Sequence, residues 1–67
     1  MRLLNRQDTI KAVKKSKAVY VYSVALERHI KVFKTDVINQ LNDMSDTHLV
    51  EIYDWEDGSI VLERDDS

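Results

Sequence analysis

The sequence predicts a small α+β domain in which two helices cover one face of a four-stranded, mostly antiparallel sheet. First, 67 residues are enough for one domain only. Second, apolar residues fall into six blocks whose spacing alternates between the helical and the strand period, in the order α-β-β-α-β-β. Third, a short polar break separates the strand-like blocks of each pair, so each pair is expected to form a hairpin.

The first helix is expected over residues 6–16. Asn5 is a favourable N-cap, and Asp8 places an acid in the first turn, where the helix dipole stabilises it. Lysines cluster at the other end, where cations are favoured. The apolar stripe is expected to consist of Leu3 or Leu4 at the entrance, then Ile10 and Val13.

The first hairpin is expected from residues 18–26 and 29–34. The first segment is rich in β-branched and aromatic residues and is apolar on both faces, as in a central strand. The second segment alternates polar and apolar residues with a period of two. The polar pair Glu27-Arg28 separates them.

The second helix is expected over residues 36–43, with Thr35 as its N-cap. Two more strands follow, over residues 47–55 and 60–64. Between them Asp57-Gly58 is the strongest local hairpin signal in the chain. We expect the domain to span residues 1–64 and the acidic end, residues 65–67, to be frayed.

Charge is divided unevenly along the chain, although the net charge is only −2. Residues 1–34 hold nine bases and two acids, a balance of +7, whereas residues 35–67 hold one base and ten acids, a balance of −9. The two halves are expected to neutralise each other, either within one molecule or between two copies with opposite ends facing. We expect each half to be one helix plus one hairpin.

Several functions are disfavoured by composition. Without cysteine the chain has no disulfide, thiolate metal site or cysteine nucleophile, and one glycine is too few for a phosphate-binding loop. The two histidines are separated along the chain, and no calcium-loop pattern is present. We therefore expect no enzyme activity, cofactor or metal. No apolar stretch is long enough to span a membrane, and with no export signal we expect a cytoplasmic location.

Strand alternation predicts an aromatic sheet face. If the aliphatic side of each strand faces the helices, all five aromatic residues gather on the other face. These residues are Tyr20, Tyr22, Phe33, Tyr53 and Trp55. The opposite orientation, with the aromatic residues in the core, remains open because aromatic side chains bury the most area. An exposed aromatic face indicates a surface that binds a partner protein or a second copy.

The leading hypothesis is a small protein-interaction module, a regulator, inhibitor or adaptor, which forms a homodimer and binds a partner protein. Trp55 and Tyr53 are expected to be the apolar anchors, and nearby acids to orient a basic partner. The predicted binding residues are Glu51, Tyr53, Asp54, Trp55, Glu56 and Asp57.

The alternative hypothesis is a nucleic-acid-binding accessory protein that uses the basic first helix. Residues 11, 14 and 15 share one helix face and could neutralise phosphates, with aromatic residues beside them for base stacking. The acidic second half would repel a long polyanion. The residues of this alternative site are Lys11, Lys14, Lys15 and Lys17.

Overall fold

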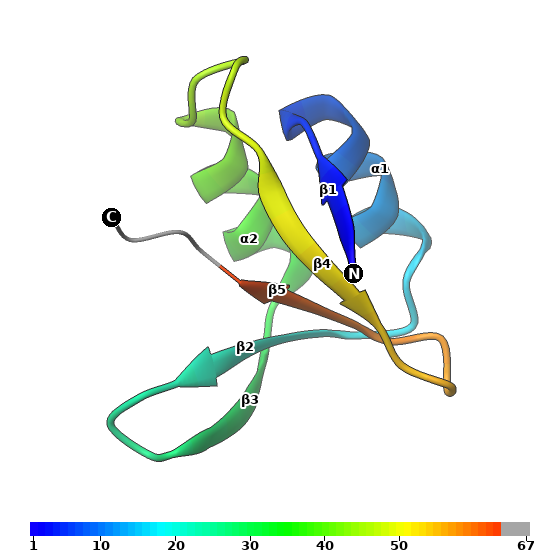
Figure 1. Cartoon of the computed structure of the whole chain (residues 1–67), viewed down its shortest axis with the longest axis vertical. Helices are drawn as coiled ribbons and strands as arrows, with labels where there is room; N and C mark the ends of the chain where they lie inside the picture. The colour runs from blue at the N-terminus through cyan, green and yellow to red at the C-terminus, as the bar shows by residue number, and fades with distance from the viewer. Residues whose placement is uncertain (64–67) are drawn as a thin grey trace.

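A computed structural model describes residues 1–63, which form two helices and a five-stranded mixed sheet (Figure 1). The elements are β1 (Arg2–Leu4), α1 (Arg6–Lys15), β2 (Val19–Ser23), β3 (Arg28–Val32), α2 (Lys34–Asn42), β4 (Val50–Asp54) and β5 (Ile60–Glu63). The α+β class and the two helices are confirmed, but the prediction of four strands is wrong. Arg64 and the predicted frayed end, residues 65–67, lie outside the described residues.

The strand order is β1-β4-β5-β2-β3, which joins the two predicted hairpins through a parallel pair. β2 runs parallel to β5, with Val19 opposite Ile60 and Val21 opposite Leu62. The other pairs, β1–β4, β4–β5 and β2–β3, are antiparallel. The basic and acidic halves are therefore interleaved in one sheet, and the expectation that each half is one helix plus one hairpin is wrong.

The fifth strand is β1, formed by residues expected to extend the first helix. Arg2 lies opposite Ile52 and Leu4 opposite Val50. Leu4 is half-buried and packs against the core, whereas Leu3 points the other way and is exposed. Three residues are too few to display a strand period, so β1 depends on pairing with β4 rather than on local sequence.

The two helices begin differently from each other. In α1 the Asn5 side chain accepts a hydrogen bond from the Asp8 backbone N–H at 2.8 Å, which confirms the predicted cap. In α2 the N-cap is Phe33, which offers no side-chain acceptor, and Thr35 lies inside the first turn. The Lys34 ammonium donates to the Ser16 carbonyl at the end of α1, so a tertiary contact holds the start of α2.

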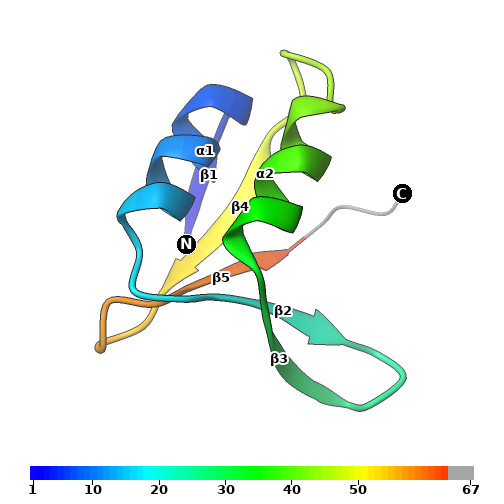
Figure 2. The ribbon, with the colours of Figure 1, turned by 180° about the vertical axis from the view of Figure 1, so that it is seen from behind.

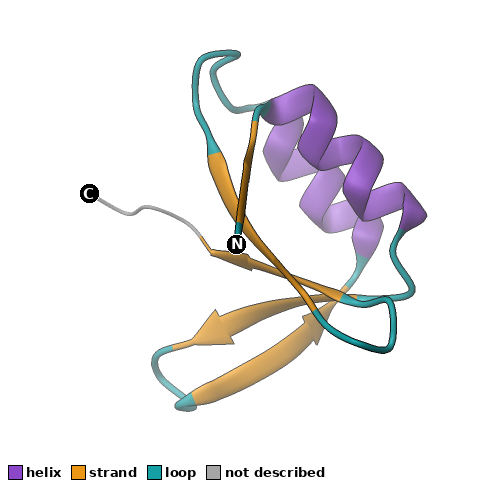
Figure 3. Cartoon of the chain, turned by 45° about the vertical axis from the view of Figure 1, so that its right-hand side comes forward, coloured by secondary structure: helices purple, strands orange, loops and turns teal. Residues whose placement is uncertain are grey.

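Both helices lie on the same side of the sheet (Figures 2 and 3). They pack against each other and against the aliphatic side of the strands. The buried core consists of Val13, Val19, Val37, Leu41, Val50, Ile52, Ile60 and Leu62. The orientation with aliphatic residues toward the helices is confirmed, and the opposite one, with an aromatic core, is wrong.

The strands are shorter than predicted because turns take up their ends. Residues 24–27 form the first turn, in which Glu27 has a φ of 52°. β4 begins only at Val50, after a loop in which the Ser45 and Thr47 hydroxyls are 3.0 Å apart. The predicted Asp57-Gly58 turn is confirmed: Gly58 has a φ of 92°, a value that favours glycine.

No helix of the described part of the chain is long and apolar enough to cross a membrane.

Candidate protein-interaction face

We call the side of the sheet that carries no helix the open face. Because successive strand residues point to opposite faces, the observed registers assign its side chains. They are Leu3, Tyr20, Tyr22, His29, Lys31, Glu51, Tyr53, Val61 and Glu63. Trp55, directly after β4, joins them through ring contacts with β2 and β3. The open face is therefore aromatic at its centre.

A connected group of four rings, the ring cluster, crosses the open face from β4 to β3. The Trp55 ring lies 4.6 Å from that of Tyr20 and 5.6 Å, edge-on, from that of His29. His29 in turn lies 5.2 Å from Tyr22. These spacings are those of favourable aromatic pairs, so each ring restricts the others.

The ring cluster is ordered by its neighbours but is not enclosed. Trp55 keeps 38% of its surface exposed, Tyr22 keeps 48% and Tyr53 keeps 37%. Beneath them Val61 is only 2% exposed, because its register partners Tyr20 and Tyr53 flank it on both sides. The rings thus shield the middle of the sheet with one surface and present the other to solvent.

Charge on the open face is separated across the sheet. Glu51 and Glu63 are direct partners on β4 and β5, whereas Lys31 lies on the far edge strand, opposite Tyr20. The carboxylate of Glu63, then partial burial, then the carboxylate of Glu51 raise the pKa of the exposed Tyr53 phenol above its ordinary value. The open face is therefore acidic on the β4–β5 side, aromatic in the middle and basic on the β3 side.

The predicted binding residues do not all share one face. Glu51, Tyr53 and Trp55 lie together on the open face, as expected. Asp54 points to the helix side, where both carboxylate oxygens accept from the Arg2 guanidinium at 2.8 and 2.9 Å. Asp54 is therefore engaged within the molecule rather than placed beside the anchors.

The acidic turn after β4 is partly structural. The Asp57 carboxylate accepts a hydrogen bond from the Ser59 backbone N–H at 2.8 Å. The backbone and side-chain hydrogen bonds from Ser59, and then the charge of Lys17, hold the pKa of Asp57 below its ordinary value. Only Glu56 of the three predicted turn acids is exposed and makes no hydrogen bond in the described structure.

Three open-face residues were absent from the predicted binding set: His29, Lys31 and Glu63. The period-two alternation of residues 29–34 places His29 and Lys31 on one face, but the hairpin register was needed to put them opposite Tyr22 and Tyr20. Phe33, predicted to join the aromatic face, instead lies at the N-cap of α2 and is 79% exposed.

The lysines of the alternative site are separated from the rings. Lys11, Lys14 and Lys15 are exposed on α1, which lies on the other side of the sheet from the ring cluster (Figure 3). Lys17 follows the helix, and its backbone N–H donates to the Gly58 carbonyl at 3.0 Å. The structure therefore does not combine these lysines with the predicted stacking residues.

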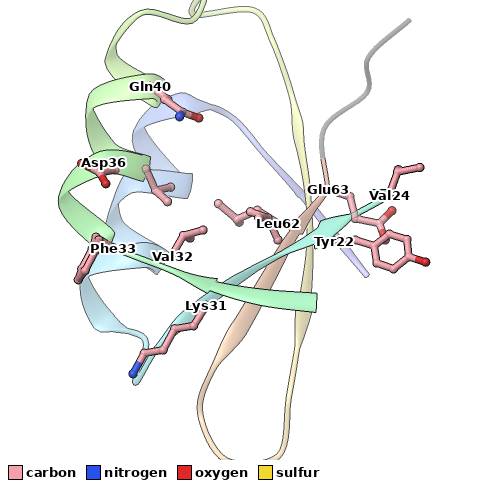
Figure 4. Close-up of a pocket in the computed structure, with 11 residues that line it drawn as sticks. Tyr22, Val24, Lys31, Val32, Phe33, Asp36, Gln40, Leu62 and Glu63 are labelled. Atoms are coloured by element: carbon pink, nitrogen blue, oxygen red, sulfur yellow. The ribbon is translucent and has the colours of Figure 1, made fainter. Parts of the chain in front are cut away.

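A cavity of about 650 Å³ opens beside α2 (Figure 4). Side chains of α2 line one side of it and those of β2, β3 and β5 the other. A smaller hollow of about 320 Å³ adjoins it and shares Val21, Val37 and Leu62. This groove reaches the aliphatic core from the helix side and is separate from the ring cluster.

No protein-family model, curated protein or solved structure matches this chain. Within residues 1–63 no group of three His, Cys, Asp or Glu side chains is arranged to hold a metal ion.

Proposed function

We propose that this chain is a non-catalytic protein-interaction module, a regulator, inhibitor or adaptor, that binds a partner protein through the open face. The observation that supports this most directly is the ring cluster: four connected rings on the one sheet face that no helix covers. Surfaces of this kind mark interaction sites, since Trp and Tyr dominate binding energy there. The absence of cysteine is compatible with the cytoplasmic location that we propose.

Trp55 and Tyr53 are the proposed anchors. Their rings are already held by neighbours, so binding would cost little side-chain entropy. Glu51 and Glu63 border them and would orient a partner that carries basic groups. Asp54 and Asp57, which are occupied by Arg2 and Ser59, have no part in the binding surface as we now define it.

Site-specific photo-cross-linking in the producing cell tests this proposal. A photoreactive residue replaces Tyr22 on the open face or, as the matched control, Lys11 on α1; both positions are exposed. We expect protein adducts from position 22 that excess wild-type chain suppresses and excess Trp55→Ala chain does not. Equal adducts from both positions, or equal suppression by both competitors, would contradict the proposal.

A second candidate function is nucleic-acid binding through α1. Lys11, Lys14 and Lys15 are exposed, and the ion pairs within residues 1–63 involve other residues. A triple change of these lysines to Ala should then reduce the salt dependence of binding to a single-stranded oligonucleotide, by about 0.7 per lost phosphate contact. Lys31→Ala on the open face is the control. Unchanged binding in the triple variant would reject the assignment.

A further inference from the structure

The charges on the open face have an order that matters for packing. Along the strand order β4, β5, β2, β3 the open face carries Glu51, Glu63, Tyr22 and His29 in one row. The next row carries Tyr53, Val61, Tyr20 and Lys31. Acids thus occupy one side of the ring cluster and the basic edge strand the other.

We propose that the partner of the open face is a second copy of this chain, packed face to face about a two-fold axis that runs parallel to the strands between β5 and β2. The inference rests on the proposed function and names its partner. This axis places β3 of one copy over β4 of the other, and β2 over β5. A two-fold interface must be self-complementary, and the order of charges on the open face meets that condition.

The pairs that this axis creates are chemically matched. Tyr22 lies over the second copy's Glu63, and its hydroxyl can donate to that carboxylate. Lys31 lies over the second copy's Tyr53, with Glu51 one row further along the strand. The ring cluster meets its own copy at the centre, where two sheets pack about 10 Å apart.

The other face-to-face arrangement is disfavoured by charge. An axis perpendicular to the strands would place each strand over itself. Glu51 and Glu63 would then face carboxylates, and Lys31 would face the basic edge strand. Like charges across an interface oppose association, so electrostatics select the axis parallel to the strands.

The size of the open face sets the expected affinity. Five strands spaced about 4.8 Å apart and about five residues long make a face of about 400 Å². This is below the roughly 800 Å² per partner of a standard interface, so we expect a reversible dimer with a Kd on the order of 10 µM. Association would supplement the thin core of a chain without disulfides.

Charge-reversed variants test the axis directly. Lys31→Glu alone should face the acids of its own copy, and Glu51→Lys/Glu63→Lys alone should face Lys31. We expect each variant to self-associate at least tenfold more weakly than wild type, and an equimolar mixture to form a heterodimer with near wild-type affinity in sedimentation equilibrium. Lys11→Glu, with the same charge change on α1, should dimerise like wild type.

Trp55, the sole tryptophan, gives an independent measurement on the unmodified chain. Its emission should shift to the blue with concentration, at the midpoint found by sedimentation. A wild-type monomer at several hundred µM, self-association without this shift, or a mixture of variants that fails to associate would each overturn the proposal. In those cases the adducts formed with other proteins at position 22 still decide the proposed function separately.

Discussion

Trp55 belongs partly to the folded core and partly to the surface. Its ring packs on Tyr20 and His29, yet 38% of its surface is exposed. Val61 beneath the rings is shielded by Tyr20 and Tyr53 rather than by Trp55 directly, as the register shows. Removing the indole should therefore affect binding more than folding.

Trp55→Ala is expected to lower the free energy of unfolding by about 1–2 kcal/mol, less than for a fully buried tryptophan, because part of the ring is already in water. Chemical denaturation followed by circular dichroism, at a concentration well below the dimer Kd, measures this loss. Tyr22→Ala, which removes the more exposed ring, should cost less. A Trp55→Ala chain that fails to fold would show that the indole is a core residue.

Asp57 should make the stability of the chain depend on pH. Its hydrogen bonds to Ser59 lower the pKa of the carboxyl in the folded state, so they stabilise the fold above the unfolded pKa and this stabilisation is lost as pH falls through the folded pKa. The urea midpoint of Asp57→Ala should fall below that of wild type at pH 7, and the gap should narrow at about pH 2.5. Glu56→Ala, which removes an acid without a hydrogen bond in the described structure, should show no such narrowing. A gap that stays constant with pH would assign the effect to the backbone of the turn.

At the scale of elements, local chemistry predicted some parts of the fold and tertiary contacts decided the others. Asn5 and Gly58 specify a helix start and a turn through their own backbone and side-chain chemistry, so both were predicted. The start of α2 was not, because Lys34 bonds to Ser16, which lies in another element. The parallel β2–β5 pair joins segments about forty residues apart, and no local pattern records such a pairing.

Strand β1 provides a matched pair of neighbouring leucines. Leu4 packs against the core whereas Leu3 is exposed on the open face. Leu4→Ala should reduce the free energy of unfolding of the monomer by about 1–2 kcal/mol, and Leu3→Ala by less than about 0.5 kcal/mol. Urea denaturation of the two variants measures the difference. Equal losses would mean that β1 does not hold Leu4 against β4.

At the scale of the whole molecule, the uneven charge of the sequence becomes two separate features. Ion pairs join the basic and acidic halves within one molecule, Arg2 to Asp54 and Arg6 to Asp46. The remaining division lies on the open face, between β4–β5 and β3. The sequence predicted three of its residues, Glu51, Tyr53 and Trp55, through strand alternation. The others required the register between strands, which alternation alone does not contain.

Salt should weaken the fold only slightly. The Arg2–Asp54 pair is about half exposed, and exposed pairs contribute little because water and ions screen them. Raising NaCl from about 0.05 to about 0.5 M should reduce the free energy of unfolding of the monomer by less than about 1 kcal/mol. Most of that effect should disappear in Arg2→Met/Arg6→Met. A salt effect of the same size in the double variant would place the relevant charges elsewhere.

The central position of β5 has a consequence for biosynthesis. It lies between β4 and β2, yet it is the last strand of the described chain to leave the ribosome. Until Ile60–Glu63 emerge, β1–β4 and β2–β3 are two strand pairs with no common neighbour, and their aliphatic sides lack a floor. Stable folding during translation therefore has to wait for this strand, and the long-range pairing slows it further. Until then, the nascent chain exposes the valines and isoleucines of its future core to chaperones and proteases.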